Sequence, residues 1–326
     1  MNNNPFFHNS IGKGRPQILL IGNGVERVTG QLGWGQLLDD LCAPGRARAT
    51  KEQKDTIPFP LLYQLLSTPQ PAPSSLSETE VNAEEKRLEK GLGNLKHTSN
   101  SLLDRIPDLG VDHVFTTNYG YSIEKAFYPA RNVAKASVRT SLRFVLSFPD
   151  KDGKIRTERE YRLHAGYEGK NTDGTRVGIW HLHGETGVPR GIIVGHDRYG
   201  RLLSRIEALC REELRRSQNE EQRQFRSWPE LFLYGDIYIL GFGFLPCEYD
   251  LWWLLRRKQR EHYADGHVYY FDNDNENEES VALRYLLLES HGVQINPLQV
   301  KKQKNYLAFY DQALDAIAEH VRTLKS

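Results

Sequence analysis

Five short apolar segments recur along the chain of 326 residues, and each runs directly into small or polar residues. They cover residues 18–24, 114–119, 179–184, 237–243 and 268–272. Short continuous apolar runs are typical of strands that are buried on both faces. In an open parallel sheet, ligands bind beyond the carboxyl ends of the strands. The recurrence therefore predicts one pocket, shared by residues that are far apart in the chain.

Segments with helical spacing separate these strands, and this alternation predicts an α/β fold. We expect a doubly wound, mostly parallel, Rossmann-like sheet with helices on both faces. A single domain is predicted over residues 1–326, with a helical and loop insertion at 44–106 and a hairpin-containing insertion at 130–178. More local expectations are a flexible arm at 1–15, hairpin strands at 141–148 and 155–163, a core strand at 191–195 and a charged helix at 199–224.

Composition argues against several classes of partner and site. The net charge is +1, which gives no reason to expect nucleic acid or an anionic membrane as a partner. The cysteines Cys42, Cys210 and Cys247 form no C-x-x-C pair, which argues against a disulfide framework and a structural zinc site. No run approaches the roughly 20 apolar residues that span a bilayer, and the first residues lack a signal core. We expect a cytoplasmic protein without a metal.

The first strand ends at Gly22, Asn23 and Gly24, where backbone N–H groups can approach a pyrophosphate without obstruction by side chains. A Gly-x-Gly after a strand is also common in simple turns, and the place of the usual third glycine is held by Arg27. Both interpretations, a phosphate site and a turn, stay open for this motif.

Polar residues follow two further strands. Asn118 comes after Thr116 and Thr117 at the end of a buried strand and precedes Tyr119; its amide is costly there unless it is paired, although it also fits a cap of the next helix. His181 and His183 share one face of a strand. His183, at the strand end, is better placed for a ligand and for proton transfer, whereas a satisfied core histidine is the alternative for either.

Two later segments complete the expected pocket. Gly241, Phe242 and Gly243 follow a strand and would let a ribose or an adenine lie against the backbone. Asp272 ends the next strand and would accept hydrogen bonds from ribose hydroxyls or from the adenine amine. The alternative for Asp272 is a solvated turn.

The order of these motifs resembles the sirtuin-like NAD-binding family, and in particular its bacterial branch of antiphage-defence NADases. The resemblance spans roughly residues 17–272 and includes the stretch 192–199 after the histidine. It implies that Asn118 lies by the nicotinamide ribose and positions the attacking group, and that His183 acts as general base. Two features depart from the family: Gly120 stands where an aspartate is usual, and the four-cysteine zinc module of the protein deacylases is missing.

The resemblance implies an NAD glycohydrolase that releases nicotinamide and ADP-ribose, regulated as an effector of antiphage defence by NAD depletion. NAD is then the substrate, and a homo-oligomer or a partner such as a HerA-like ATPase or a short Argonaute is expected. Two alternatives remain. One is an NAD or ADP-ribose sensor without catalysis, which Gly120 favours. The other is an NAD-dependent protein deacylase or ADP-ribosyltransferase, which needs an acceptor.

Overall fold

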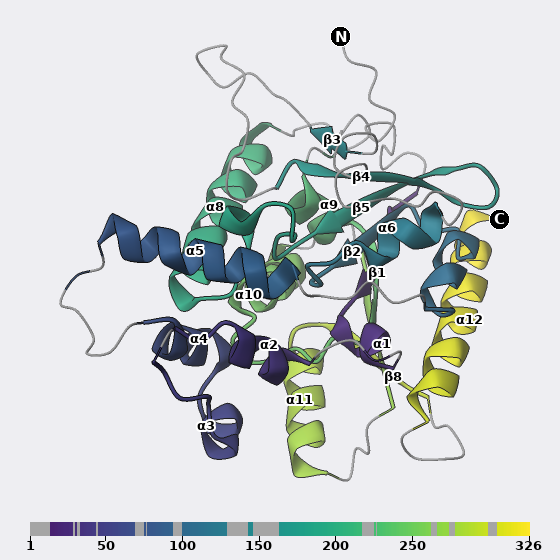
Figure 1. Cartoon of the computed structure of the whole chain (residues 1–326). Coiled ribbons are helices and arrows are strands. Elements are labelled where there is room, and N and C mark those ends of the chain that lie inside the picture. The colour runs from purple at the N-terminus through teal and green to yellow at the C-terminus, as the bar shows by residue number, and fades with distance from the viewer. Residues whose placement is uncertain are drawn as a thin grey trace.

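The centre of the structure is a sheet with the strand order β3-β4-β5-β2-β1-β6-β7-β8 (Figure 1). This computed structural model describes residues 14–28, 30, 33–43, 45–68, 75, 77–93, 100–128, 143–145, 163–216, 225, 227–261, 266–273, 278–298 and 305–326. The strands are β1 (Gln17–Ile21), β2 (His113–Thr116), β3 (Arg143–Val145), β4 (Ala165–Lys170), β5 (Arg176–His181), β6 (Asp236–Leu240), β7 (Val268–Asp272) and β8 (Val293–Pro297).

Neighbouring strands pair in parallel along the part of the sheet with the order β5-β2-β1-β6-β7-β8. In contrast, β4 is antiparallel to β5, and β3 is antiparallel to β4. Side chains alternate between the two faces, so Ile18 and Leu20 of β1 enter one core while Leu19 and Ile21 enter the other. The predicted mostly parallel α/β fold is confirmed.

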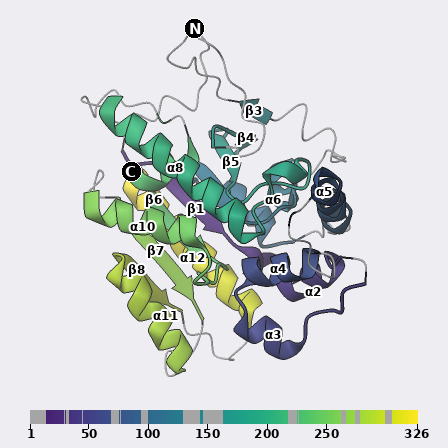
Figure 2. The ribbon, with the colours of Figure 1, turned by 90° about the vertical axis from the view of Figure 1, so that its left-hand side faces the viewer.

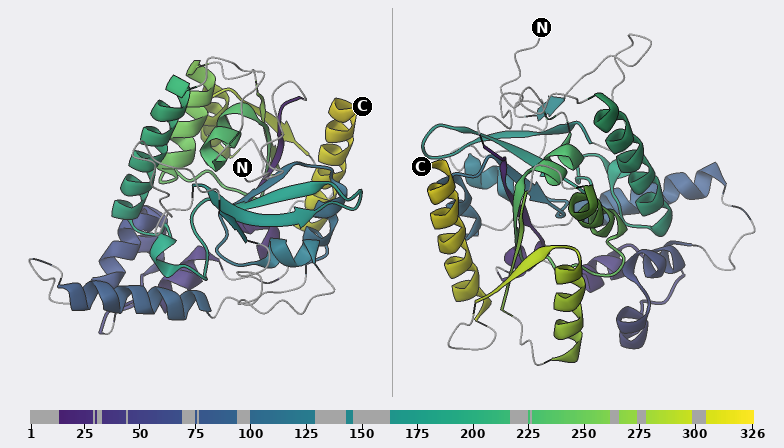
Figure 3. Two further views of the ribbon diagram at one scale, coloured as in Figure 1. Left: turned by 90° about the horizontal axis from the view of Figure 1, so that it is seen from above. Right: turned by 180° about the vertical axis from the view of Figure 1, so that it is seen from behind.

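Helices cover both faces of the sheet. One face carries α8 (His196–Arg216), α9 (Trp228–Tyr234), α10 (Tyr249–Glu261) and α11 (Glu279–Ser290), and Figure 2 shows α8, α10 and α11 lying across it. The other face carries α1 (Asn23–Arg27), the 3-10 helix η3 (Leu103–Asp108), α6 (Ser122–Phe127) and α12 (Tyr306–Lys325). Seen from above, the sheet lies between α8 and α12 (Figure 3).

A third, smaller core joins the predicted insertion to the sheet. It contains apolar residues of α2 (Trp34–Asp40), α4 (Phe59–Ser67) and α5 (Glu78–Gly93), together with Tyr119, Ile192 and Val194. The short helix α3 (Lys51–Thr56) precedes α4 and has no buried residue. Leu103 and Ile106, near the end of the predicted insertion, belong instead to the core beside the sheet.

The prediction of a strand at residues 191–195 is wrong. The 3-10 helix η4 (Pro189–Gly191) leads into an irregular segment, in which the Ile193 N–H donates to the His183 carbonyl over 2.8 Å. Ile192, Ile193 and Val194 are buried between two cores rather than within the sheet. A short apolar run indicates burial but does not by itself distinguish a strand from another buried segment.

The hairpin visible in the structure is formed by β4 and β5. It was not predicted. Of the strands expected at 141–148 and 155–163, only residues 143–145 and 163 are described, and β3 pairs with β4. Most of the arm expected at 1–15, and the end of the helix expected at 199–224, lie outside the described residues. No helix in the described part of the chain combines the length and apolar character that a bilayer crossing requires.

Close contact between the ends of β1 and β6 predicts a strong effect of substitution at Gly22. A Cβ there would lie 2.4 Å from the carbonyl oxygen of Gly241, so Gly22→Ala forces the backbone apart. We expect Gly22→Ala to lower the free energy of unfolding by about 1–3 kcal/mol, measured by urea denaturation.

The matched control is Gly200→Ala. Gly200 lies within α8, and an added Cβ there meets no atom within 4 Å outside the helix's own backbone. Because alanine is more favourable than glycine within a helix, the free energy of unfolding of this variant is expected to be about 0.5–1 kcal/mol higher than that of the parent protein. Equal stabilities of the two variants would contradict the contact argument.

Candidate functional site

A cavity of about 540 Å³ lies at the carboxyl ends of β1, β6 and β7. Strand order reverses here, because β2 lies on one side of β1 and β6 on the other. Ligands of open α/β sheets bind at such a reversal. The described lining consists of Asn23, Gly24, Arg27, Val28, Thr117, Gly241, Phe242, Gly243, Phe244, Leu245, Glu248, Tyr270, Phe271, Asp272, Arg284, Tyr306, Phe309 and Tyr310.

Seven of the predicted site residues line this cavity: Asn23, Gly24, Thr117, Gly241, Phe242, Gly243 and Asp272. The structure thus brings together segments from four different strand ends. Phe244 in the same loop has a φ of 47°, which is uncommon for a residue with a side chain and marks local backbone strain.

Asp272 already has partners at both carboxylate oxygens. Arg284 donates to its Oδ2 over 2.6 Å, and the Asn273 N–H donates to its Oδ1 over 2.8 Å. A ribose hydroxyl at this carboxylate would therefore share it with a guanidinium, which itself lines the cavity.

Gly22, Thr116 and Tyr119 are not among the described lining residues, and each has a local structural contact. The Gly22 N–H donates to the Leu240 carbonyl, Thr116 Oγ1 accepts from the Asn118 N–H, and the Tyr119 hydroxyl donates to the Ile193 carbonyl. The Gly24 N–H, which was expected to face a phosphate, donates to the Gly241 carbonyl over 2.8 Å. These glycines hold two strand ends together.

Asn118 is buried and follows Thr117, which lines the cavity. Its Nδ2 donates to Glu26 Oε1 over 2.9 Å. The backbone carbonyl oxygen of Asn118 lies 2.8 Å from His181 Nδ1. Because a carbonyl oxygen can only accept a hydrogen bond, His181 Nδ1 carries a proton. Glu26 thereby fixes the orientation of the Asn118 amide. Burial raises the pKa of Glu26, although the hydrogen bond from Asn118 opposes this shift.

His181 is satisfied at both ring nitrogens, because its Nε2 lies 2.8 Å from Glu124 Oε1. Burial alone would lower its pKa, but the Glu124 carboxylate raises the pKa of His181 to about 9. His181 is the core histidine of the alternative interpretation.

His183 lies in a different environment, between two acidic residues that precede or begin α10. Its Nε2 is 3.0 Å from Asp250 Oδ2, and its Nδ1 is 3.7 Å from Glu248 Oε2. Burial opposes protonation, yet the Asp250 and Glu248 carboxylates raise the pKa of His183 to about 8. In the neutral ring, an Nε2–H that donates to Asp250 leaves the Nδ1 lone pair as a base.

Glu248 connects His183 to the ligand space, because it lines the cavity and approaches His183 Nδ1. Its Oε2 also accepts a hydrogen bond of 2.9 Å from the Tyr199 hydroxyl. Burial raises the pKa of Glu248. His183 itself is not among the described lining residues.

The same three residues are of types that bind divalent metals. Donor atoms of His183, Glu248 and Asp250 lie within 4.8 Å of one another, and the buried Asp250 Oδ1 has no hydrogen-bond partner among the described residues. Their contacts with one another already pair the imidazole with both acids. The absence of a metal stays a prediction.

Asn118 and His183 lie at the same end of the sheet. Thr116 of β2 pairs in register with His181 of β5, and each candidate follows its strand by two residues beyond that pair. Glu26, Glu248 and Asp250 were not predicted. Their only signal in the sequence is an acidic residue shortly after a glycine-containing strand end, and acids in a first helical turn are common for electrostatic reasons alone.

Residues 112–295, more than half of the chain, match the family model described as the SIR2-like domain. The matched region contains Asn118, His183, Glu248 and Asp250, and begins after Gly22 and Gly24. No curated protein matches the chain.

Proposed function

The chain belongs to the SIR2-like domain family, and from this membership we propose that it is an NAD glycohydrolase, which cleaves NAD to nicotinamide and ADP-ribose. The observation that carries the proposal is the cavity at the strand-order reversal, which Thr117, the neighbour of Asn118, lines and to which Glu248 connects His183. Its volume of about 540 Å³ lies in the range of small-molecule sites.

The lining suits the separate parts of NAD. Aromatic residues of α12, Tyr306, Phe309 and Tyr310, offer apolar surface for the adenine, and Asp272 with Arg284 offers polar partners for its ribose. Arg27 brings a positive charge for the pyrophosphate. The nicotinamide ribose would then lie toward Thr117 and Glu248, next to the two candidate catalytic residues.

The reaction breaks the bond between the ribose C1′ and the nicotinamide nitrogen, and the electron pair of that bond neutralises the pyridinium. A water oxygen forms the new bond to C1′; the water's proton passes to the Glu248 carboxylate, and a proton passes from Glu248 to His183 Nδ1. The Asn118 amide, held by Glu26, positions the water or the ribose. Positioning and general-base catalysis are the two contributions required of the protein.

A non-catalytic NAD or ADP-ribose sensor is the second candidate. Gly120 favours it, since the family commonly has an aspartate there, and so does the fact that Asn118 and His183 are not among the described lining residues. A sensor would bind NAD without releasing nicotinamide.

Unregulated NAD hydrolysis would deplete the cell of NAD, so we also propose a regulated effector that acts in antiphage defence. A homo-oligomer, or a partner such as a HerA-like ATPase or a short Argonaute, would supply the control.

The decisive experiment incubates the purified protein with NAD, alone and with candidate partners, and separates the products by chromatography. We expect nicotinamide and ADP-ribose in equal amounts. Saturable NAD binding without nicotinamide release under every condition would establish the sensor instead. Release that occurs only with an acceptor peptide would indicate a deacylase or transferase.

The pH dependence of turnover should follow the protonation of His183. A general base has to be unprotonated, so turnover is expected to rise as pH increases through about 8, the pKa of His183. The Asp250 carboxylate is one of the groups that raise this pKa, so Asp250→Asn is expected to move the midpoint to lower pH. Rates between pH 5.5 and about 9.5 test this.

Asp55→Asn is the matched control, because Asp55 is exposed on α3. It should leave the midpoint in place. An unchanged midpoint in Asp250→Asn would show that the pH dependence arises elsewhere.

A further inference from the structure

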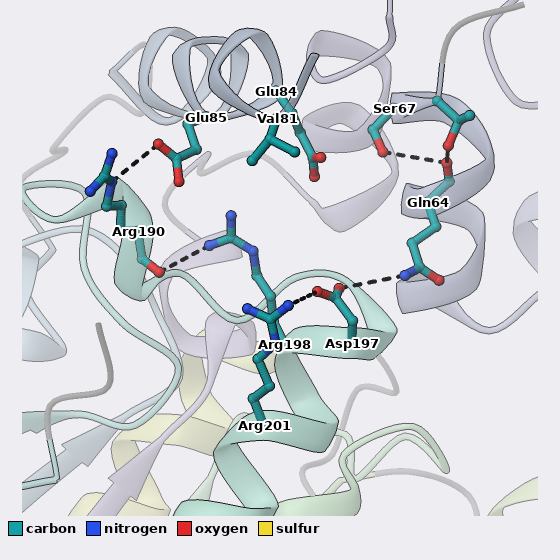
Figure 4. Close-up of a pocket in the computed structure, with 10 residues that line it drawn as sticks. Gln64, Ser67, Val81, Glu84, Glu85, Arg190, Asp197, Arg198 and Arg201 are labelled. Atoms are coloured by element: carbon teal, nitrogen blue, oxygen red, sulfur yellow. Dashed lines mark hydrogen bonds and ion pairs between the residues drawn. The ribbon is translucent and has the colours of Figure 1, made fainter. Parts of the chain in front are cut away.

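A second cavity, of about 330 Å³, lies where the insertion helices meet the start of α8 (Figure 4). It shares no described lining residue with the first cavity. Its lining comes from α4, α5, η4 and α8 and consists of Gln64, Ser67, Thr68, Val81, Glu84, Glu85, Arg190, Asp197, Arg198 and Arg201. Neither the strand-end motifs nor the proposed reaction uses any of these residues.

Arg198 is held in place and still has donors to offer. Its Nη1 donates to the carbonyls of Pro189, Arg190 and Ile192 over 3.0–3.3 Å. Its Nε and Nη2 make no hydrogen bond to a described residue. The fixed guanidinium therefore presents an N–H pair of the kind that binds a phosphate in two places.

The carboxylates of this cavity already have partners. Glu84 accepts from the Tyr63 hydroxyl over 2.6 Å, Glu85 pairs with Arg190 at 3.2 Å, and Asp197 lies 3.7 Å from Arg201. The Arg190 and Arg201 side chains are each 66% exposed, so their ion pairs are screened and weak. A phosphate can compete for both arginines, while Glu84, Glu85 and Gln64 remain as acceptors for hydroxyl groups.

We propose that this cavity binds a phosphate monoester that also carries hydroxyl groups, the chemistry shared by sugar phosphates and nucleoside monophosphates. Arg190, Arg198 and Arg201 hold the phosphate, and the acidic side of the cavity on α5 accepts from the hydroxyls.

The ligand also acts on the segment next to His183. Arg198 fixes the segment 189–192 from one side by its bonds to three backbone carbonyls, and the Arg190 side chain links this segment to Glu85 of α5. From the other side, the Ile193 N–H donates to the His183 carbonyl and the Tyr119 hydroxyl donates to the Ile193 carbonyl. Occupancy thus stabilises the backbone that positions His183. This coupling rests on the proposed function, whereas binding does not.

Binding is tested by titrating ribose 5-phosphate, AMP and inorganic phosphate into the full chain by calorimetry. We expect both esters to bind, and inorganic phosphate to bind more weakly. Arg190→Gln and Arg201→Gln should each weaken ester binding about tenfold, because each removes a charge-assisted contact. Both side chains are largely exposed, so the variants should keep the thermal stability of the parent protein.

Two controls locate the site. Arg205→Gln removes an exposed arginine one turn further along α8 and should bind ribose 5-phosphate normally. Arg27→Gln changes the first cavity and should weaken NAD binding but not ribose 5-phosphate binding. Unchanged ester affinity in Arg190→Gln and Arg201→Gln would overturn the proposal, as would inorganic phosphate binding as tightly as the esters. If NAD is not cleaved, ester binding with this pattern would still stand, and only the coupling would fail.

Discussion

Replacement of His183 by alanine is expected to reduce nicotinamide release about 10²- to 10⁴-fold, the usual contribution of a general base. In its neutral form His183 combines an Nδ1 lone pair on the side of Glu248, 3.7 Å from Oε2, with an orienting carboxylate, Asp250, at 3.0 Å from Nε2. Removal of the ring leaves the proton of the attacking water without its final acceptor. The measurement is the initial rate of nicotinamide release at saturating NAD, at a pH above 8.

The His183→Ala variant also leaves the buried Asp250 without its partner, so stability has to be separated from chemistry. Thermal unfolding and NAD affinity of the variant provide that separation, and activity is compared per folded molecule. His267→Ala is the matched control, because His267 precedes β7 at the opposite end of the sheet and is 44% exposed. A rate within about threefold of the parent protein in His183→Ala would exclude its role as a base, given the size of such contributions.

Asn118→Ala is expected to reduce turnover by about 100-fold or more, because a reacting group misplaced by about 1 Å loses that much rate. The side-chain amide of Asn118 donates to Glu26, and the Asn118 backbone N–H donates to the Thr116 hydroxyl, so the direction of the amide is set before any ligand binds. Alanine removes the amide, so that no side chain at position 118 orients the ribose or the water. Turnover should fall more than NAD affinity, which distinguishes positioning from simple binding.

Glu26→Gln tests the same positioning argument by changing the residue that accepts the hydrogen bond of the Asn118 amide. Glutamine keeps an oxygen that accepts from Asn118 Nδ2, so its effect is expected to be smaller than that of Asn118→Ala. Asn171→Ala is the control for loss of a buried asparagine, since Asn171 lies in the turn between β4 and β5 at the other end of the sheet. If Asn118→Ala and Asn171→Ala lose the same activity, the effect of Asn118 is one of stability alone.

Local pattern was enough to predict the strands that carry the site. The run from Ile18 to Ile21 has too few residues and too little polarity for a surface helix, and every residue of β1 is buried. Five such runs predicted the parallel sheet, and the sheet in turn predicted a shared pocket at the carboxyl ends of its strands. Thr117, Gly241 and Asp272 line the cavity because the backbone direction of a parallel sheet places their segments there.

The same kind of pattern failed at residues 191–195. Ile192, Ile193 and Val194 are as apolar as a strand, but the backbone of Ile193 bonds the segment after β5 rather than a neighbouring strand. Apolar composition reports that a segment is buried. It does not report which cores bury it, because that depends on where the insertion helices α2, α4 and α5 pack.

The sequence by itself predicted a pocket at the carboxyl ends of the strands, and the two candidate residues that it singled out, Asn118 and His183, both lie at that end of the sheet. Only the tertiary structure decided their partners: Glu26 is 92 residues from Asn118 in the chain, and Asp250 is 67 residues from His183. The physical reason is that strand periodicity is a local property, whereas the protonation state and direction of a buried side chain depend on charges brought to it by distant helices. The second cavity, between α5 and α8, likewise exists only once the insertion packs against the core.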